Sequence, residues 1–173
     1  ARIMNIPFFN YPRLYTDQKE DMLKIFEDVC SRGAFIMQSD LIEFEDSFAK
    51  FANSNYALGV ANGTDAMELV LIAIGMNPGD EVIICSHTMV ATASAIITAG
   101  GVPVPVELGY DNLIGPQAIE DAITPNTVGI MPTQLNGRTC NMDAIQLIAN
   151  KHGLFIVEDS AQALGSRFKG QHA

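Results

Sequence analysis

The sequence predicts an α/β fold in which a mostly parallel sheet is covered by helices on both faces. Short apolar runs, such as Val82-Ile83-Ile84 and Phe155-Ile156-Val157, alternate along the chain with stretches of helical periodicity. These runs are apolar at consecutive positions, so both faces of each strand are expected to be buried. Parallel sheets between two layers of helices have this property. One doubly wound domain is the expected result.

The amino-terminal residues lack the alternation of the rest of the chain. Residues 1–16 contain prolines and aromatic residues without any period, which predicts an extended arm, with the sheet-bearing domain over 17–173. From Asp17 a helix is expected, ending near Gly33. Its apolar stripe consists of Met22, Ile25, Phe26 and Val29.

A second helix is expected over residues 40–52, before the alternating part begins. Asp40 and Glu43 have the spacing of a capping box at its start. Its expected buried face consists of Leu41, Phe44, Phe48 and Phe51. Strands are then expected at 56–61, 81–85, 102–107, 127–132 and 154–158, and helices at 64–75, 88–99, 115–123 and 141–152.

Composition narrows the class of protein and of partner. The chain has 173 residues, of which 48% are hydrophobic, enough to bury a sizeable core. Its net charge of −10 argues against nucleic acid or an anionic membrane as the main partner. An anionic substrate would have to be held locally, by backbone N–H groups or a few Arg and Lys side chains.

Cysteine usage and hydropathy favour a soluble cytoplasmic protein. Cys30, Cys85 and Cys140 lie far apart without CxxC spacing, so neither a disulfide framework nor a metal site is expected. No apolar run approaches the roughly 20 residues of a membrane helix. The start of the chain lacks the apolar core of a signal peptide.

Three polar segments follow predicted strands, where ligands bind in open α/β sheets. The first is Asn62-Gly63-Thr64, which precedes a helix. Glycine allows close approach of a ligand, and the first N–H groups of the helix are unpaired, so the segment suits a phosphate group. An ordinary helix cap explains the same residues equally well.

The second segment is Ser86-His87-Thr88-Met89, and the third contains Asp159 and Gln162. A carboxylate at the end of a buried strand requires a cationic partner, because desolvation penalises a lone charge by several kcal/mol. The alternative for Asp159 is the N-cap of a following short helix. For His87 a solvated loop position is the simpler interpretation.

Taken together, these segments resemble the fold-type-I, pyridoxal-phosphate-dependent sugar aminotransferases of the DegT/StrS group. The resemblance rests on the order Gly63-Thr64, Thr-x-x-Ala-Thr at 88–92 and Asp-x-x-Gln at 159–162, with Met-Asp-Ala-Ile at 142–145. The chain departs from the family pattern where an aromatic residue, a His and a Tyr are usual. Met89, Gln134 and Asn136 occupy these positions.

The resemblance implies pyridoxal 5′-phosphate as cofactor and a role for each matching residue. Asp159 would pair with the pyridinium nitrogen, Gln162 would contact the O3′ edge of the ring, and Met89 would lie on the ring face. Gly63 and Thr64 would hold the phosphate. The implied reaction transfers an amino group from glutamate or glutamine to a nucleotide-linked keto-sugar, in a homodimer with its sites at the subunit interface.

The resemblance also implies that the chain is the amino-terminal part of a longer enzyme. The family's Schiff-base lysine would fall about fifteen residues beyond Ala173, and Lys169 matches the turn before it. The last sheet strands and the small carboxy-terminal domain would then be absent, so residues 1–173 alone are expected to be inactive.

Three alternatives remain open at this point. A truncated homologue would fold without catalysing the reaction, and a dehydratase would use the same scaffold with His in place of the lysine. A doubly wound nucleotide-binding module would use Gly63 and Thr64 alone. Against the last, no GxGxxG run follows the first predicted strand, and Asp159 and Gln162 would be unexplained.

Overall fold

The structure is a computed structural model that describes residues 6–173. It divides into two compact units, the first ending at Phe44 and the second comprising Glu45–Ala173. Residues 1–5 of the expected arm lie outside the described residues.

Helix α1 (Tyr11–Arg32) corrects the prediction of an extended arm over residues 11–16. The side chain of Asn10 caps the helix by accepting the N–H of Arg13 at 3.2 Å. Pro12 lies in the first turn, where the missing N–H needs no partner and the fixed φ suits a helix. The prolines that suggested an irregular arm therefore include one that begins the helix. Gly33, with φ 64°, ends it.

The apolar stripe predicted for this helix exists, but the first unit does not bury it. None of the residues of α1 is buried, and the side chains of Ile25 and Phe26 are 64% and 69% exposed. The period of the stripe thus identifies a face of the helix that no described residue of the first unit covers.

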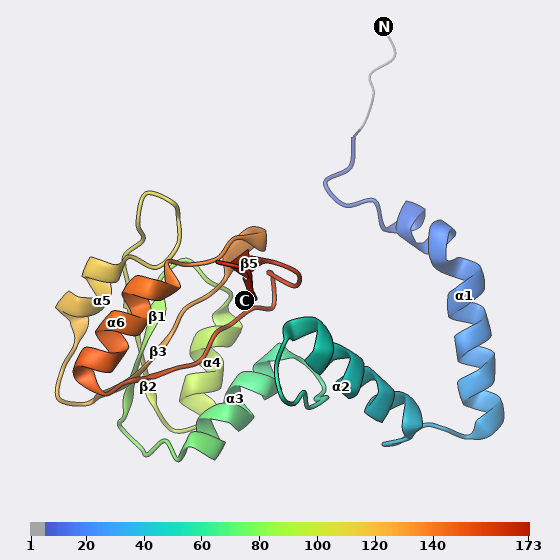
Figure 1. Cartoon of the computed structure of the whole chain (residues 1–173), viewed down its shortest axis with the longest axis horizontal. Coiled ribbons are helices and arrows are strands. Elements are labelled where there is room, and N and C mark those ends of the chain that lie inside the picture. Colours follow the sequence, from blue (N-terminus) through green and yellow to red (C-terminus); the bar gives the residue numbers. More distant parts are fainter. Residues whose placement is uncertain (1–5) are drawn as a thin grey trace, which may run out of the picture. The chain divides into compact units, whose positions relative to one another are not determined.

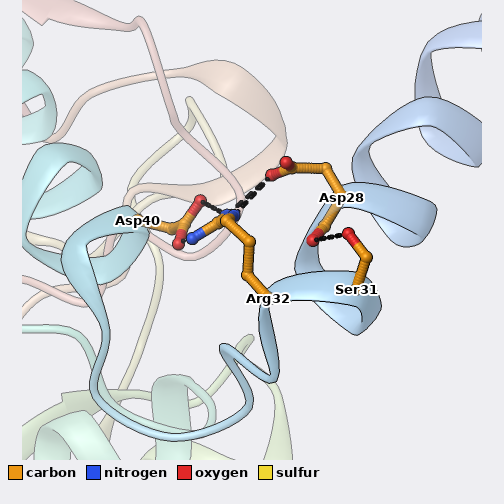
Figure 2. A network of polar contacts seen from close by, with 4 residues as sticks. All are labelled: Asp28, Ser31, Arg32 and Asp40. Carbon is orange, nitrogen blue, oxygen red and sulfur yellow. Dashed lines mark hydrogen bonds and ion pairs between the residues drawn. The ribbon is translucent and has the colours of Figure 1, made fainter.

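Helix α2 (Ser39–Ala52) begins one residue before the prediction, which changes the role of Asp40. Instead of forming a capping box, Asp40 accepts a hydrogen bond from Arg32, whose guanidinium also binds Asp28 (Figure 2). The Nη2–Oδ distances are 2.7 Å to Asp28 and 3.0 Å to Asp40. The hydrogen bond from Arg32 lowers the pKa of Asp40. Because these groups are largely exposed, the network contributes little to stability.

The second unit contains the predicted parallel sheet. Strands β1 (Glu81–Cys85), β2 (Val102–Val106), β3 (Thr127–Met131) and β4 (Phe155–Ile156) pair in the order β2-β1-β3-β4, and every pairing is parallel. An antiparallel pair, β5 (Arg167–Phe168) and β6 (Gln171–His172), follows. The strand predicted at 56–61 is wrong: these residues form no ladder. β-branched and aromatic residues favour a strand, but a strand also needs a partner for its backbone.

Helices cover both faces of the sheet, as predicted (Figure 1). The core cluster on one face joins α3 (Gly63–Ile74) and α4 (Val90–Thr98) to Val82 and Ile84. The cluster on the other face joins α5 (Pro116–Ala122) and α6 (Met142–His152) to Ile83 and Cys85. Alternate residues of β1 therefore enter opposite cores, which explains why the strand is apolar at consecutive positions.

Strand β2 lies at one edge of this sheet and carries prolines at alternate positions. The N–H of Val102 donates to Asp80 beside β1, at 2.8 Å, so Pro103 and Pro105 direct their backbone groups away from β1. Proline has no N–H, and sheets tolerate it at such outward edge positions.

Candidate active site

The carboxyl ends of β1 and β4 bring together two of the three polar segments identified in the sequence, those of Thr88 and Asp159, whereas Asn62-Gly63-Thr64 follows no strand and begins α3. Beyond β4 the pairing with β3 continues as a single bridge between Asp159 and Thr133. The N–H of Asp159 donates to Pro132 at 2.9 Å, and its carbonyl oxygen accepts the N–H of Gln134 at 2.9 Å. Asp159 is thus fixed by backbone bonds at the carboxyl edge of the sheet.

The side chain of Asp159 is buried, and it accepts hydrogen bonds from neutral groups. The residue is 6% exposed. Its Oδ2 accepts from the Thr92 hydroxyl at 2.7 Å, and its Oδ1 accepts from the N–H of Ala161 at 3.3 Å. Within residues 6–173, no Lys, Arg or His forms an ion pair with it. The charge of this carboxylate is therefore solvated by dipoles but not neutralised.

The helix-cap alternative for Asp159 does not hold, because no helix follows it. Residues 160–166 form turns, and the bond from the N–H of Ala161 closes a local turn two residues after Asp159. No helix terminus therefore stabilises the carboxylate, and the expectation of a cationic partner remains.

Gly63 and Thr64 form the first turn of α3, and Asn62 is the residue that caps it. The side chain of Asn62 accepts the N–H of Asp65 at 3.0 Å, and its carbonyl oxygen accepts the N–H of Ala66 at 3.1 Å. The N–H groups of Gly63 and Thr64 precede these and have no acceptor within the helix. A Cβ on Gly63 would lie 3.9 Å from the Cβ of Ala161, so this turn lies against the segment that follows Asp159.

Met89 is the N-cap residue of α4, which begins at Val90 rather than at the predicted residue 88. Its side chain is 63% exposed, and its carbonyl oxygen accepts the N–H of Thr92 at 3.1 Å. Met89 therefore lies one helical turn from the threonine that binds Asp159. His87 is exposed, in agreement with the simpler interpretation of a loop histidine.

Gln162 is held at its oxygen, with its side chain exposed. Its Oε1 accepts the N–H of Asn136 at 3.2 Å, and its carbonyl oxygen accepts the N–H of Gly137 at 2.9 Å. Asn136 adopts φ 55°, a left-handed conformation that asparagine tolerates better than most residues. Among residues 6–173, no hydrogen bond from the amide nitrogen of Gln162 is found, so this nitrogen is available to a ligand.

Gln134 has a structural role. It is fully buried, its Oε1 accepts the N–H of Cys140 at 2.6 Å, and its Nε2 donates to Glu158 at 2.5 Å. These bonds hold the loop after β3 against the end of β4. Glu158 projects to the exposed side and Asp159 to the buried side, as the alternation of a strand requires.

Sequence reasoning missed Thr133. Its hydroxyl lies 2.8 Å from that of Thr88, which lies 2.8 Å from that of Thr92. Its place in the sequence could have identified it, because Thr133 closely follows the strand β3 as Thr88 follows β1.

A cavity beside this site contains two of the chain's few basic residues. It measures about 400 Å³ and is lined by Arg138 and Arg167, with Asp111, Gly137 and Ser166 among the other residues. Gly137 also binds Gln162, and the Ser166 hydroxyl donates to the Gly137 carbonyl at 2.7 Å. Both arginines therefore line a cavity next to the turn that holds Gln162, and the Arg167 guanidinium donates to the Gly170 carbonyl at 3.0 Å.

The lysines of the described residues lie on helices or in the turn between β5 and β6. Lys19 and Lys24 are on α1, Lys50 is on α2, Lys151 is on α6, and Lys169 is in the turn between β5 and β6, where it pairs with Asp143. None of these lysines follows a strand of the parallel sheet directly.

Comparison with known proteins shows that the chain is similar to sugar aminotransferases. It is 38% identical over 172 residues to dTDP-3-amino-3,4,6-trideoxy-alpha-D-glucose transaminase of Streptomyces venezuelae, covering 99% of this chain and 45% of the relative. It is 40% identical over 146 residues to UDP-2-acetamido-2-deoxy-3-oxo-D-glucuronate aminotransferase of Pseudomonas aeruginosa, covering 84% of this chain and 41% of the relative.

A solved structure agrees with these relatives. The crystal structure of NtdA from Bacillus subtilis with bound cofactor PMP superposes with a TM-score of 0.91 at 36% identity, covering 95% of this chain and 38% of that one. The chain therefore spans less than half the length of the proteins it matches.

The match to a family model is also extensive. It covers residues 16–173 and carries the description DegT/DnrJ/EryC1/StrS aminotransferase family. The resemblance read from the sequence is thereby confirmed, and this protein belongs to the DegT/DnrJ/EryC1/StrS aminotransferase family.

Proposed function

We propose that residues 17–173 form the amino-terminal part of the cofactor-binding domain of a pyridoxal-phosphate-dependent sugar aminotransferase. The observation that carries this proposal is the carboxylate of Asp159, 6% exposed and bound only by neutral donors among the described residues. A buried charge of this kind needs a cation, and a protonated pyridine nitrogen supplies one. The family match and the relative with bound PMP support the same cofactor.

The other residues of the site fit the rest of the cofactor. The free N–H groups of Gly63 and Thr64, at the start of α3, suit its phosphate. The Met89 side chain is exposed and flexible enough to pack on the ring face, and the Gln162 amide nitrogen can donate to the ring oxygen. When bound, the cofactor supplies an electron sink for the carbon that exchanges its amino group.

We propose a nucleotide-linked keto-sugar as amino acceptor and glutamate or glutamine as amino donor. The names of two relatives, one a dTDP-sugar transaminase and the other an aminotransferase of a UDP-linked 3-oxo sugar, support the acceptor. The cavity lined by Arg138 and Arg167 supports an anionic substrate group, since the chain as a whole carries a net charge of −10. The donor rests on the family resemblance alone.

Catalysis requires a lysine that this chain does not place at the site. We propose that the Schiff-base lysine lies beyond Ala173 in the intact protein, and that residues 1–173 alone are inactive. A cytoplasmic homodimer remains part of the proposal. The exposed aromatic residues Phe8 and Phe9, 92% and 62% exposed, support contact of the amino-terminal segment with a second copy.

The test uses the intact protein that contains this chain. It is expected to bind pyridoxal phosphate with a visible absorption band, and borohydride is expected to fix the cofactor covalently to a lysine beyond residue 173. Peptide mapping after reduction identifies the lysine. Release of all the cofactor on dialysis after borohydride treatment would contradict the proposal.

One observation favours a second candidate function. Because no lysine among residues 6–173 directly follows a strand of the parallel sheet, a truncated homologue that folds without catalysing amino transfer is the alternative. The gene sequence downstream of codon 173 separates the two, since a stop codon there would support the truncated homologue.

A further inference from the structure

Three threonine hydroxyls form a continuous chain that ends on the Asp159 carboxylate. The oxygen–oxygen distances are 2.8 Å from Thr133 to Thr88, 2.8 Å from Thr88 to Thr92, and 2.7 Å from Thr92 to Oδ2 of Asp159. Thr92, Thr133 and Asp159 are buried, and Thr88 is half-buried. The chain links residues that follow β1 and β3 to the residue that follows β4.

The direction of these hydrogen bonds follows from counting protons. An ionised carboxylate can only accept, so Thr92 gives its single hydroxyl proton to Asp159. Thr92 must then accept from Thr88, which has no proton left for Thr133 and must accept from it in turn. All three dipoles therefore point toward Asp159, and hydrogen bonds aligned in this way strengthen one another.

The two oxygens of the carboxylate are held unequally. Oδ2 accepts the short bond that ends the threonine chain, whereas Oδ1 accepts only the N–H of Ala161 at 3.3 Å. Among the described residues each oxygen thus accepts one hydrogen bond, and the bond at Oδ2 is the shorter. Because both oxygens are bound, the two contacts fix the orientation of the carboxylate.

We infer that Thr92, supported by Thr88 and Thr133, is a positioning residue that fixes Asp159 so that its carboxylate meets the cationic ring nitrogen of the cofactor. This inference rests on the proposed function. The threonines solvate the carboxylate without neutralising it, so the charge remains available to the ring nitrogen. A lysine or arginine in place of Thr92 would neutralise it.

The test measures cofactor affinity in the apo form of the intact protein, with two ligands. One is pyridoxal phosphate, and the other is its 1-deaza analogue, in which a C–H group replaces the ring nitrogen. Thr92→Val keeps the shape of the side chain and removes the hydroxyl. We expect this variant to lower the affinity for pyridoxal phosphate about tenfold, as the loss of a hydrogen bond to a charged group implies. The affinity for the analogue is expected to fall less than about twofold.

Further variants separate positioning from folding. Thr92→Ser keeps the hydroxyl, and its affinity for pyridoxal phosphate is expected to lie within about threefold of wild type. Thr88→Val breaks the chain one step from Asp159, and we expect a smaller loss, again only for pyridoxal phosphate. Thr98→Val is the matched control on the same helix, because its exposed hydroxyl donates to Ser94 at 2.9 Å and lies outside the chain.

Each outcome decides the inference. If Thr92→Val does not fold, the comparison of Thr88→Val with wild type carries the test, because Thr88 is half-buried and does not contact Asp159 directly. Equal losses for both ligands would show that the threonines only support the fold and would overturn the inference. If the wild-type protein fails to bind pyridoxal phosphate at all, the proposed function itself falls.

Discussion

Asp159 has the central role in the proposed chemistry, because its carboxylate is buried at the carboxyl edge of the sheet. Its backbone is fixed by the bridge to Thr133 and its carboxylate by Thr92. Both constraints come from segments far away in the sequence: Thr92 and Asp159 are separated by 67 positions. The fold by itself therefore fixes both the backbone and the carboxylate of Asp159.

Asp159→Asn is expected to lower turnover of the intact enzyme by orders of magnitude. The amide oxygen can still accept a hydrogen bond from the Thr92 hydroxyl, so the fold is expected to remain intact. The part of cofactor binding that depends on the phosphate should also remain. The negative charge that keeps the ring nitrogen protonated is lost, and with it the stabilisation of the transition state. Steady-state kinetics and cofactor absorbance measure the two effects separately.

Glu158→Gln is the matched control for that experiment. It removes a charge from the neighbouring residue, which is exposed and can still accept from Gln134. Turnover within a few-fold of wild type is expected. If Asp159→Asn behaved in the same way, Asp159 would have only a structural role.

The buried thiol of Cys140 is expected to make the fold less stable as the pH rises in the alkaline range. Burial raises the pKa of its thiol from 9.0 to about 11. The folded state thus favours the protonated thiol: its contribution to the free energy of unfolding is complete below pH 9 and is lost as the pH rises toward 11. The residue is fully buried, so its ionisation needs opening of the core between the sheet and α6.

We expect the free energy of unfolding of the intact protein to fall between pH 9 and 11, and to fall less steeply in Cys140→Ala. Denaturant titrations at each pH measure this difference. Cys30→Ala is the control, because Cys30 is exposed and lies in the first unit. An identical pH dependence in wild type and Cys140→Ala would rule out this role of the thiol.

At the scale of elements, Gly129 on β3 leaves room for the ring of Phe155 on the neighbouring strand β4. A Cβ at this position would lie 2.1 Å from the nearest ring atom of Phe155, its partner in the ladder. Real Cβ atoms do not approach other atoms so closely, so the ring or the strand would have to move. Asp159 follows β4, so a shift of this strand would also move the site.

Gly129→Ala is expected to destabilise the protein by about 1–3 kcal/mol, the usual cost of overpacking a core. Adding Phe155→Leu should recover part of the loss, because the smaller side chain makes room for the methyl group. Thermal or chemical unfolding of the single and double variants checks the coupling. Additive losses would mean that the ring of Phe155 is not the obstacle.

Gly63→Ala provides the contrasting glycine. The nearest atom to an added Cβ is 3.9 Å away, an ordinary contact, so the fold should be unaffected. The methyl group would stand beside the two free N–H groups proposed to bind phosphate, so weaker cofactor binding at unchanged stability is expected. Equal effects of the two glycine variants on stability would contradict this assignment of their roles.

At the scale of the whole molecule, the second unit leaves apolar surface uncovered. Strand β4 has two residues and pairs on one side with β3. On α3, Leu69 and Ile72 are 50% and 53% exposed, and Ile97 on α4 is 61% exposed. Residues 6–173 contain no helix long and apolar enough to cross a membrane. The uncovered surface is consistent with a chain that spans under half the length of its relatives.

Residues 1–173 alone are therefore expected to be inactive and poorly stable as a monomer. An open edge and exposed apolar side chains favour association, and in the described part of the chain no lysine directly follows a strand of the parallel sheet. Size-exclusion chromatography with thermal melting tests stability, and an amino-transfer assay from glutamate to a keto-sugar nucleotide tests activity. A compact monomer with a cooperative melt would show that the chain is a complete domain, and robust transamination would place the catalytic lysine within it.

The sequence alone determined the features that depend on neighbouring residues and on period. The apolar run Val82-Ile83-Ile84 predicted a strand buried on both faces, and Gly33 predicted the end of the first helix. The run Phe155-Ile156-Val157 also predicted a strand, but the two residues of β4 are only half-buried. The motifs around Gly63 and Asp159 identified the family. These signals are local, so they survive without knowledge of the fold.

Only the tertiary structure decided which distant groups meet. Residues 56–61 have strand-like composition but form no ladder, because pairing requires a partner strand and not only a favourable sequence. The threonine chain depends on the parallel order of β1, β3 and β4, which brings Thr88, Thr133 and Asp159 to one edge. A hydrogen bond between residues 67 positions apart leaves no period in the sequence, because its geometry is fixed by the pairing of the strands that carry its two ends.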